Sequence, residues 1–195
     1  MPLILEGLVT SLNDDDGLNV SPMGPIVNRA QTEFLFRPFQ TSRTFANLVR
    51  TGAGVFHVVD DVLLLAKAAI NQLDPEPETR PAEQISGRVL LDACRWYEFV
   101  VTDIDDSSER STLQTRVVHR GHLRDVWGFN RAKHAVLELA VLATRLFLME
   151  ADEIQSEVER LGILVAKTAG EQEQAAFDLL REHIANYDED NQNTF

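Results

Sequence analysis

The chain has 195 residues, of which 44% are hydrophobic and 25% are charged. This length favours a single folded domain, which would bury about 70% of the surface that its unfolded chain exposes. The formal net charge is −13. Such an acidic chain excludes a nucleic-acid-binding role, because a polyanion is attracted to basic faces and repelled by acidic ones.

The cysteine content and the N-terminus bear on where the protein works. The single cysteine, Cys94, excludes an internal disulfide, and the first residues lack the basic and apolar regions of a signal peptide. The most apolar segment, 135–149, carries Glu138 and Arg145 and is shorter than the roughly 20 residues needed to span a membrane. We therefore expect a cytoplasmic protein with no membrane partner.

The first third of the chain is predicted to be rich in β-strands. Residues 3–11 alternate in hydrophobicity and lead into a turn, 13–17, that is rich in residues tolerating a left-handed backbone. Extended structure resumes over 18–21, which completes an antiparallel hairpin. The patterns beyond it predict a strand over 32–37, a short helix over 43–50 and a strand over 54–59.

The remaining pattern changes from strands to helices. A helix is expected over 61–71, and the proline-rich segment 74–81 that follows it is expected to be a surface loop. Two long strands, 90–104 and 112–119, are joined by a polar turn. Three helices are then expected over 131–150, 151–169 and 170–186, with Gly162 and Gly170 as breaks. The acidic tail, 188–195, is predicted to be disordered.

One segment concentrates groups that bind phosphate esters. Around the start of the predicted short helix lie two arginines and three hydroxyl residues: Arg37, Thr41, Ser42, Arg43 and Thr44. Guanidinium groups, hydroxyls and the free amides at a helix start all donate hydrogen bonds to phosphate. The alternative is that Thr41 or Ser42 merely caps the helix while the arginines are solvated.

This segment, continued to Val59, resembles the phosphate-binding strand–helix–strand unit of the flavin reductase-like split barrels. Nearly the whole chain, from Leu3 to about Asn186, resembles a prokaryotic family of uncharacterised flavin-binding proteins related to the flavin reductase-like and pyridoxamine phosphate oxidase-like proteins. Four stretches carry that resemblance: Asn19–Pro25, Phe36–Phe39, Gly54–Asp61 and Gly128–Ala132.

The resemblance implies a fold, a cofactor and a set of site residues. The expected fold is α+β and mainly β: an FMN-binding split β-barrel over 1–128, with a C-terminal helical segment, 129–187, packed on the barrel or on a dimer partner. A homodimer would hold flavin mononucleotide (FMN) in a groove between its subunits. The residues expected at the cofactor are Ser21, Met23, Gly24, Arg37, Phe39, Thr41, Ser42, Arg43, Thr44, Asn130 and Arg131.

Several other polar residues have structural explanations. His57 lies in an apolar strand and is expected to be a core or interface residue rather than a proton donor. His119 and His122 lack a third ligand at metal spacing, so no metal site is expected. His134 and Glu138 lie one turn apart on an apolar helix and are expected to form an ion pair. Asn130 can cap that helix without any ligand.

These features favour an FMN-dependent oxidoreductase whose redox substrate is unknown and whose chemistry belongs chiefly to the cofactor. No residue is identifiable as a catalytic acid or base. Two alternatives stay open. One is a flavin carrier or sensor without turnover, which the apolar helix over 131–150 would serve as a partner surface, and the other is a module that binds another phosphorylated or pterin-like ligand.

Overall fold

The computed structural model describes residues 3–192, with side chains described as far as residue 187. The chain divides into two compact units. The first contains the residues up to 59 and residues 76–126, and the second contains residues 60–75 and those from 127 onward. We refer to them as the barrel unit and the helical unit.

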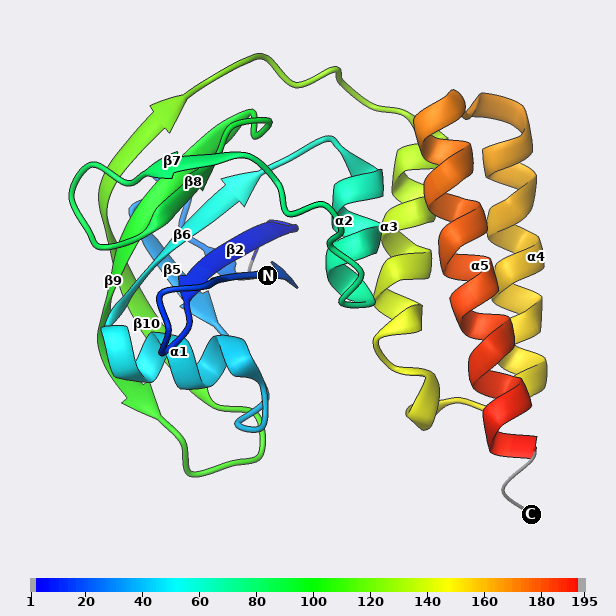
Figure 1. The fold of residues 1–195 in the computed structure, drawn as a ribbon, viewed down its shortest axis with the longest axis horizontal. Helices are drawn as coiled ribbons and strands as arrows, with labels where there is room; N and C mark the ends of the chain where they lie inside the picture. The colour runs from blue at the N-terminus through cyan, green and yellow to red at the C-terminus, as the bar shows by residue number, and fades with distance from the viewer. Residues whose placement is uncertain (1–2, 193–195) are drawn as a thin grey trace. The chain divides into compact units, whose positions relative to one another are not determined.

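The barrel unit is built on an antiparallel sheet of eight strands, in the order β1-β4-β5-β10-β9-β6-β2-β3. The strands are β1 (Leu3–Ile4), β2 (Gly7–Leu12), β3 (Leu18–Met23), β4 (Ile26–Val27), β5 (Glu33–Phe36), β6 (Ala53–Val58), β9 (Arg95–Asp105) and β10 (Thr112–His122). Two register shifts interrupt the pairing of β9 with β10, at Gln114/Thr115 and Val117/His119. Such irregularities bend and twist a strand, and the sheet curls into the half-barrel seen in Figure 1.

The interior of the curled sheet is filled mainly by aromatic side chains. Phe34, Phe36, Phe56 and Phe99 are each at most 1% exposed, and the Phe34 and Phe56 rings meet edge to face with centroids 5.4 Å apart. Helix α1 (Arg43–Thr51) buries Leu48 completely in the same cluster. This buried leucine anchors the helix, while its N-terminal residue, Arg43, stays exposed.

The strand expected over 90–104 is two strands. Strand β8 (Arg88–Leu90) pairs with β7 (Thr79–Pro81) in a separate two-stranded ribbon, and β9 begins only at Arg95. Between them the chain turns, and the Cys94 N–H donates to the Val58 carbonyl. An apolar run predicts extended structure on either side of this turn but does not reveal the turn itself.

The helical unit contains α2 (Val62–Ala69), α3 (Arg131–Ala143), a 3₁₀ turn (Leu146–Leu148), α4 (Ala151–Thr168) and α5 (Glu171–Gln192). Helix α2 packs against α3 and α5, so residues 60–75, which were expected within the 1–128 barrel segment, belong to the helical unit. Its buried residues Val62, Leu65, Ala66 and Ala68 explain this, because they need apolar partners that the C-terminal helices supply.

Three helix predictions need correction. The helix expected to reach residue 150 ends at Ala143. Gly162 lies inside α4 rather than at a break, and a Cβ at this position would be in ordinary contact, 3.4 Å, with the Phe177 ring of α5. Helix α5 continues through residues 188–192, which were expected to be disordered, while 193–195 lie outside the described residues. No helix among residues 3–192 is long and apolar enough to cross a membrane.

Candidate functional site

The start of α1 is fixed by a serine cap. The Ser42 Oγ accepts a hydrogen bond from the Phe45 N–H at 3.2 Å and donates to the Phe39 carbonyl at 2.7 Å. At the other end, Gly52 adopts a left-handed φ of 67° and donates its N–H to the Leu48 carbonyl. Ser42 therefore caps the helix, as the alternative to phosphate binding predicted. Both hydrogen bonds of its hydroxyl are made within the protein.

Around this cap, hydrogen-bond donors are left facing solvent. Arg37, Thr41 and Arg43 are all exposed, and none has a side-chain partner within the part of the chain that the structure describes. The backbone amides of the first helical residues, Arg43 and Thr44, have no intrahelical acceptor either. Two guanidinium groups and one hydroxyl thus lie without side-chain partners within residues 37–43, at or just before the start of α1, and a phosphate ester binds donors of these kinds.

Thr44 faces inward. Its side chain is 2% exposed, and its Oγ1 accepts from the Asn19 amide at 3.1 Å. The same Asn19 amide also lies 3.0 Å from the Ser11 Oγ, which in turn accepts from Asn47 at 3.1 Å. The hydroxyl of Thr44, expected to face a phosphate, is thus used within the fold.

This largely buried network ties α1 to β3, an edge strand of the sheet, through the partly buried Asn19. Ser21 and Met23 are two and four residues beyond Asn19 on that strand, about 7 and 14 Å further along at about 3.4 Å per residue. As β3 has a neighbour only on its β2 side, alternate backbone groups point away from the sheet. Two of the residues predicted for the ring, Ser21 and Met23, therefore lie on the strand that α1 contacts.

Met23 and Gly24 end this strand in different surroundings. Met23 is partly buried and packs against the aromatic core. Gly24 is exposed, and a Cβ there would lie 2.6 Å from both carboxylate oxygens of Glu6. The missing side chain at Gly24 thus makes room for Glu6, a contact that sequence reasoning did not anticipate.

A second contact missed by sequence reasoning holds the segment 38–40, just before the cap. Phe39 forms an isolated bridge with Arg110, whose guanidinium lies 4.8 Å from the centre of the Phe39 ring. The Gln40 Nε2 donates to the carbonyls of Asp106 and Ser108 at 2.6 and 2.8 Å. These partners are some seventy residues away in sequence, so no local pattern signals them.

His57 is buried in the barrel core, as expected. Its Nδ1 lies 3.2 Å from the Leu8 carbonyl, and its Nε2 accepts from the Leu90 N–H at 3.1 Å. Complete burial lowers the pKa of His57 to about 3, although the hydrogen bond to Leu8 opposes this. The imidazole is neutral at physiological pH and has no access to a substrate.

The predicted residues Asn130 and Arg131 begin α3 in the helical unit. The Asn130 Oδ1 accepts from the N–H groups of Ala132 and Lys133, and its Nδ2 donates to the Thr168 carbonyl at 3.0 Å. Its capping role is therefore realised, together with a bond to the end of α4. Arg131 is exposed.

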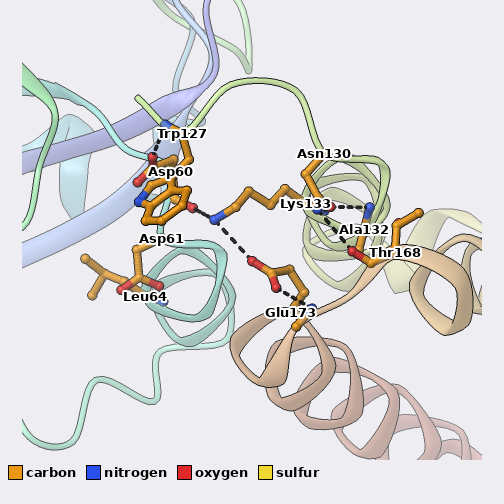
Figure 2. Close-up of polar contacts among 10 residues, drawn as sticks. Asp60, Asp61, Leu64, Trp127, Asn130, Ala132, Lys133, Thr168 and Glu173 are labelled. Carbon is orange, nitrogen blue, oxygen red and sulfur yellow. Dashed lines mark hydrogen bonds and ion pairs between the residues drawn. The ribbon is translucent and has the colours of Figure 1, made fainter. Parts of the chain in front are cut away.

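Next to this cap, Lys133 joins three segments of the helical unit (Figure 2). Its Nζ donates to the Asp60 carbonyl at 2.5 Å and pairs with the Glu173 carboxylate at 3.1 Å. Burial alone would raise the pKa of Glu173, but its bonds from the Gly170 N–H and from Lys133 outweigh burial, and the pKa is lowered. The Asp60 carboxylate accepts from the Trp127 N–H at 2.8 Å.

The remaining titratable pairs do not form a site. His134 and Glu138 are both exposed, so the buried ion pair expected between them is not what the structure shows, and His134 instead stacks on Phe129. His119 pairs with Glu83. Among the described residues, no group of three or more His, Cys, Asp or Glu side chains is placed to hold a metal ion.

Similar structures share this architecture. An FMN-bound DUF447 protein from Methanosarcina mazei superposes with a TM-score of 0.80 and 22% identity, covering 94% of this chain and 96% of that one. The 2-nitrobenzoate 2-nitroreductase of Pseudomonas fluorescens superposes with a TM-score of 0.52 and 19% identity, covering 63% and 66%. A homologue of nitrilotriacetate monooxygenase component B from Mycobacterium thermoresistibile gives 0.52 and 12%, covering 62% and 70%. At these identities the likeness speaks for the fold, and it confirms the expected α+β split barrel with C-terminal helices.

Among curated protein sequences, none matches this chain significantly. Two family models do match. The model described as "Protein of unknown function (DUF447) N-terminal domain" matches residues 5–124, and the one described as "Protein of unknown function (DUF447)" matches residues 130–182. Together they span most of the chain and confirm the family resemblance, so the protein belongs to the DUF447 family.

Proposed function

We propose that this protein binds FMN on the barrel unit, with the phosphate at the start of α1 and the ring along β3. The observation that carries the proposal is the donor set at the helix start, where Arg37, Thr41 and Arg43 are exposed without side-chain partners among the described residues. A structure of similar fold and the same family, from Methanosarcina mazei, is described as FMN-bound. Both the local chemistry and this relative point to a flavin phosphate.

The residues divide into a phosphate end and a ring end. Arg37, Arg43, the Thr41 hydroxyl and the first amides of α1 would hold the phosphate dianion. Ser21 and Met23 would lie along the ring, with backbone groups of β3 available to its polar edge. When bound, the ring can transfer a hydride or electrons, and the protein supplies binding and orientation.

We further propose that the protein is an oxidoreductase acting as a cytoplasmic homodimer. The oxidoreductase activity is supported by flavin-reducing and nitroreducing proteins among those of similar fold, such as the flavin reductase component of a bacterial tryptophan halogenase. A flavin carrier without turnover is the second candidate. It is favoured by one observation: the groups at the donor set are arginines, hydroxyls and amides, and none of them is a general acid or base near neutral pH.

Titration of purified apoprotein with FMN and with riboflavin, followed by flavin fluorescence, tests the phosphate site. Each charge-assisted bond contributes about 1.5–3 kcal/mol, so Arg43→Ala or Arg37→Ala should raise the Kd for FMN roughly ten- to a hundred-fold. Riboflavin, which lacks the phosphate, should bind the parent and both variants equally. Arg29→Ala, which removes another exposed arginine of the same unit, is the matched control. Unchanged FMN binding in both variants would overturn the proposal.

A second measurement separates the enzyme from the carrier. Bleaching of the bound flavin by a nicotinamide cofactor, with recovery on adding an electron acceptor, supports the oxidoreductase. Bound flavin that no donor reduces supports the carrier. Competition between FMN and another phosphorylated ligand would reveal the third possibility, and sedimentation would report whether the protein is a dimer.

A further inference from the structure

The hairpin that joins β9 to β10 holds the segment before α1 through backbone bonds on both sides of Phe39. The Ser111 N–H donates to the Pro38 carbonyl at 3.1 Å, and the Gln40 N–H donates to the Glu109 carbonyl at 3.2 Å. Arg110 adds its contact with the Phe39 ring. Phe39 and Arg110 therefore form an isolated antiparallel bridge, with one backbone hydrogen bond on each side of Phe39.

Within the described residues, Gln40 is the one side chain of the 38–40 segment that forms hydrogen bonds with the tip of the β9–β10 hairpin. Its Nε2 donates to two carbonyls, Asp106 at 2.6 Å and Ser108 at 2.8 Å. A side-chain amide has two N–H groups, and both are used here. Gln40 is exposed, so its amide could bond to water instead, and burial does not force these two hydrogen bonds to form.

Gln40 directly precedes the residues that carry the phosphate donors. The next three residues are Thr41, the capping Ser42 and Arg43, and the Ser42 N–H and Oγ both donate to the Phe39 carbonyl. The backbone that presents Thr41 and Arg43 is thus held between two fixed points, the hairpin on one side and the partly buried Asn19–Thr44 bond on the other. Without the hairpin bonds, a ligand would have to order this backbone itself, which weakens binding by the conformational entropy lost.

We propose that Gln40 is a positioning residue for the phosphate, acting by clamping the 38–42 segment to the β9–β10 hairpin. This inference rests on the proposed function, because it assumes that the donors of this segment bind the FMN phosphate. Gln40 itself would touch no part of the flavin. Its amide preorganises the donors, and preorganisation strengthens binding by lowering the ordering cost.

The test is Gln40→Met, which keeps the length of the side chain and removes both N–H donors. We expect the Kd for FMN to rise about fivefold to tenfold, as for losing two exposed neutral hydrogen bonds. The Kd for riboflavin should not change. Gln114→Met is the matched control, because Gln114 is an exposed glutamine of β10 whose side chain makes no hydrogen bond among the described residues. This control should bind both flavins as the parent does.

The ratio of the two dissociation constants separates positioning from general damage. Equal weakening of FMN and riboflavin by Gln40→Met would overturn the inference, since it would mean that the variant disturbs the whole site. Unchanged FMN binding would overturn it as well. Gln40→Asn, which keeps the amide but is too short to reach both carbonyls, should give an intermediate ratio and serves if the methionine variant does not fold.

The result for Arg43→Ala distinguishes failure of this inference from failure of the proposed function. If Arg43→Ala weakens FMN binding and Gln40→Met does not, the phosphate site stands and the clamp is wrong. If Arg43→Ala leaves FMN binding unchanged, the phosphate lies elsewhere, and the proposed function fails together with the role of Gln40.

Discussion

The neutral histidine in the barrel core gives a sharp prediction about pH. His57 is fully buried between the Leu8 carbonyl and the Leu90 N–H. Protonation would place a second N–H on the ring opposite the Leu90 donor and would bury a charge without a counter-ion. Since the pKa falls from 6.5 to about 3 on folding, the unfolded chain takes up a proton in a range where the folded protein does not. The stability from neutral His57 is thus complete above pH 6.5 and is lost progressively toward pH 3.

The size of the effect follows from linkage. Each pKa unit corresponds to about 1.4 kcal/mol, so the full loss near pH 3 is about 5 kcal/mol. Between pH 7 and pH 5 the loss is about 2 kcal/mol by the same relation. A domain is typically stable by about 5–15 kcal/mol, so this change is large enough to measure.

Urea unfolding of the barrel unit at pH 7 and pH 5 measures this loss. Trp96 is 5% exposed and reports on the barrel core, so the experiment is done in a Trp127→Phe background that removes the helical unit's tryptophan. The parent should lose about 2 kcal/mol more than His57→Gln between the two pH values. His122→Gln, which removes an exposed histidine from the same unit, should behave as the parent does. An equal pH response in parent and His57→Gln would refute the reasoning.

Two further predictions concern single contacts. Lys133→Met should destabilise the helical unit by about 2 kcal/mol at neutral pH, because the Glu173 side chain, 9% exposed, loses its cation. Far-UV circular dichroism on heating checks this against Lys167→Met, an exposed control, and the difference should shrink as the pH falls below 4.5 and Glu173 is protonated. Ser42→Ala should cost about 1 kcal/mol and speed hydrogen exchange at the Phe45 amide, whereas Ser42→Thr should preserve slow exchange. Equal loss in the two lysine variants, or unchanged exchange in Ser42→Ala, would contradict these accounts.

Elements whose signals are local could be predicted from the sequence. The hairpin of β2 and β3 was indicated by alternating strands around an Asn- and Asp-rich turn, where Asp16 indeed adopts a positive φ of 60°. The short helix was signalled by the serine that caps it, and α1 spans Arg43–Thr51 against the expected 43–50. These patterns depend on nearest neighbours along the chain, so one sequence is enough to reveal them.

Features that depend on distant partners could not be predicted. The roles of Thr44 and Gln40 are set by Asn19 and by the β9–β10 hairpin, 25 and more than 60 residues away. A hydroxyl residue next to an arginine looks the same in the sequence whether its side chain faces solvent or the interior. The sequence alone does not show which way the side chain points. The sequence placed α2 within the barrel segment, whereas it belongs to the helical unit, for a similar reason: an apolar helix does not reveal which neighbours it packs against.

The same distinction bears on the helical unit, where a hollow of about 430 Å³ is lined by residues that include Trp127, Asn130, Lys133 and Glu173. The polar groups of the last three already have partners within the fold: Asn130 bonds two helix amides and the end of α4, and Lys133 joins Glu173 to Asp60. A ligand there would have to break these bonds. At the start of α1 the arginines are instead exposed and have no side-chain partner among the described residues. This contrast in hydrogen-bond satisfaction is why we place the cofactor phosphate on the barrel unit, with a contact from Asn130 or Arg131 remaining a prediction.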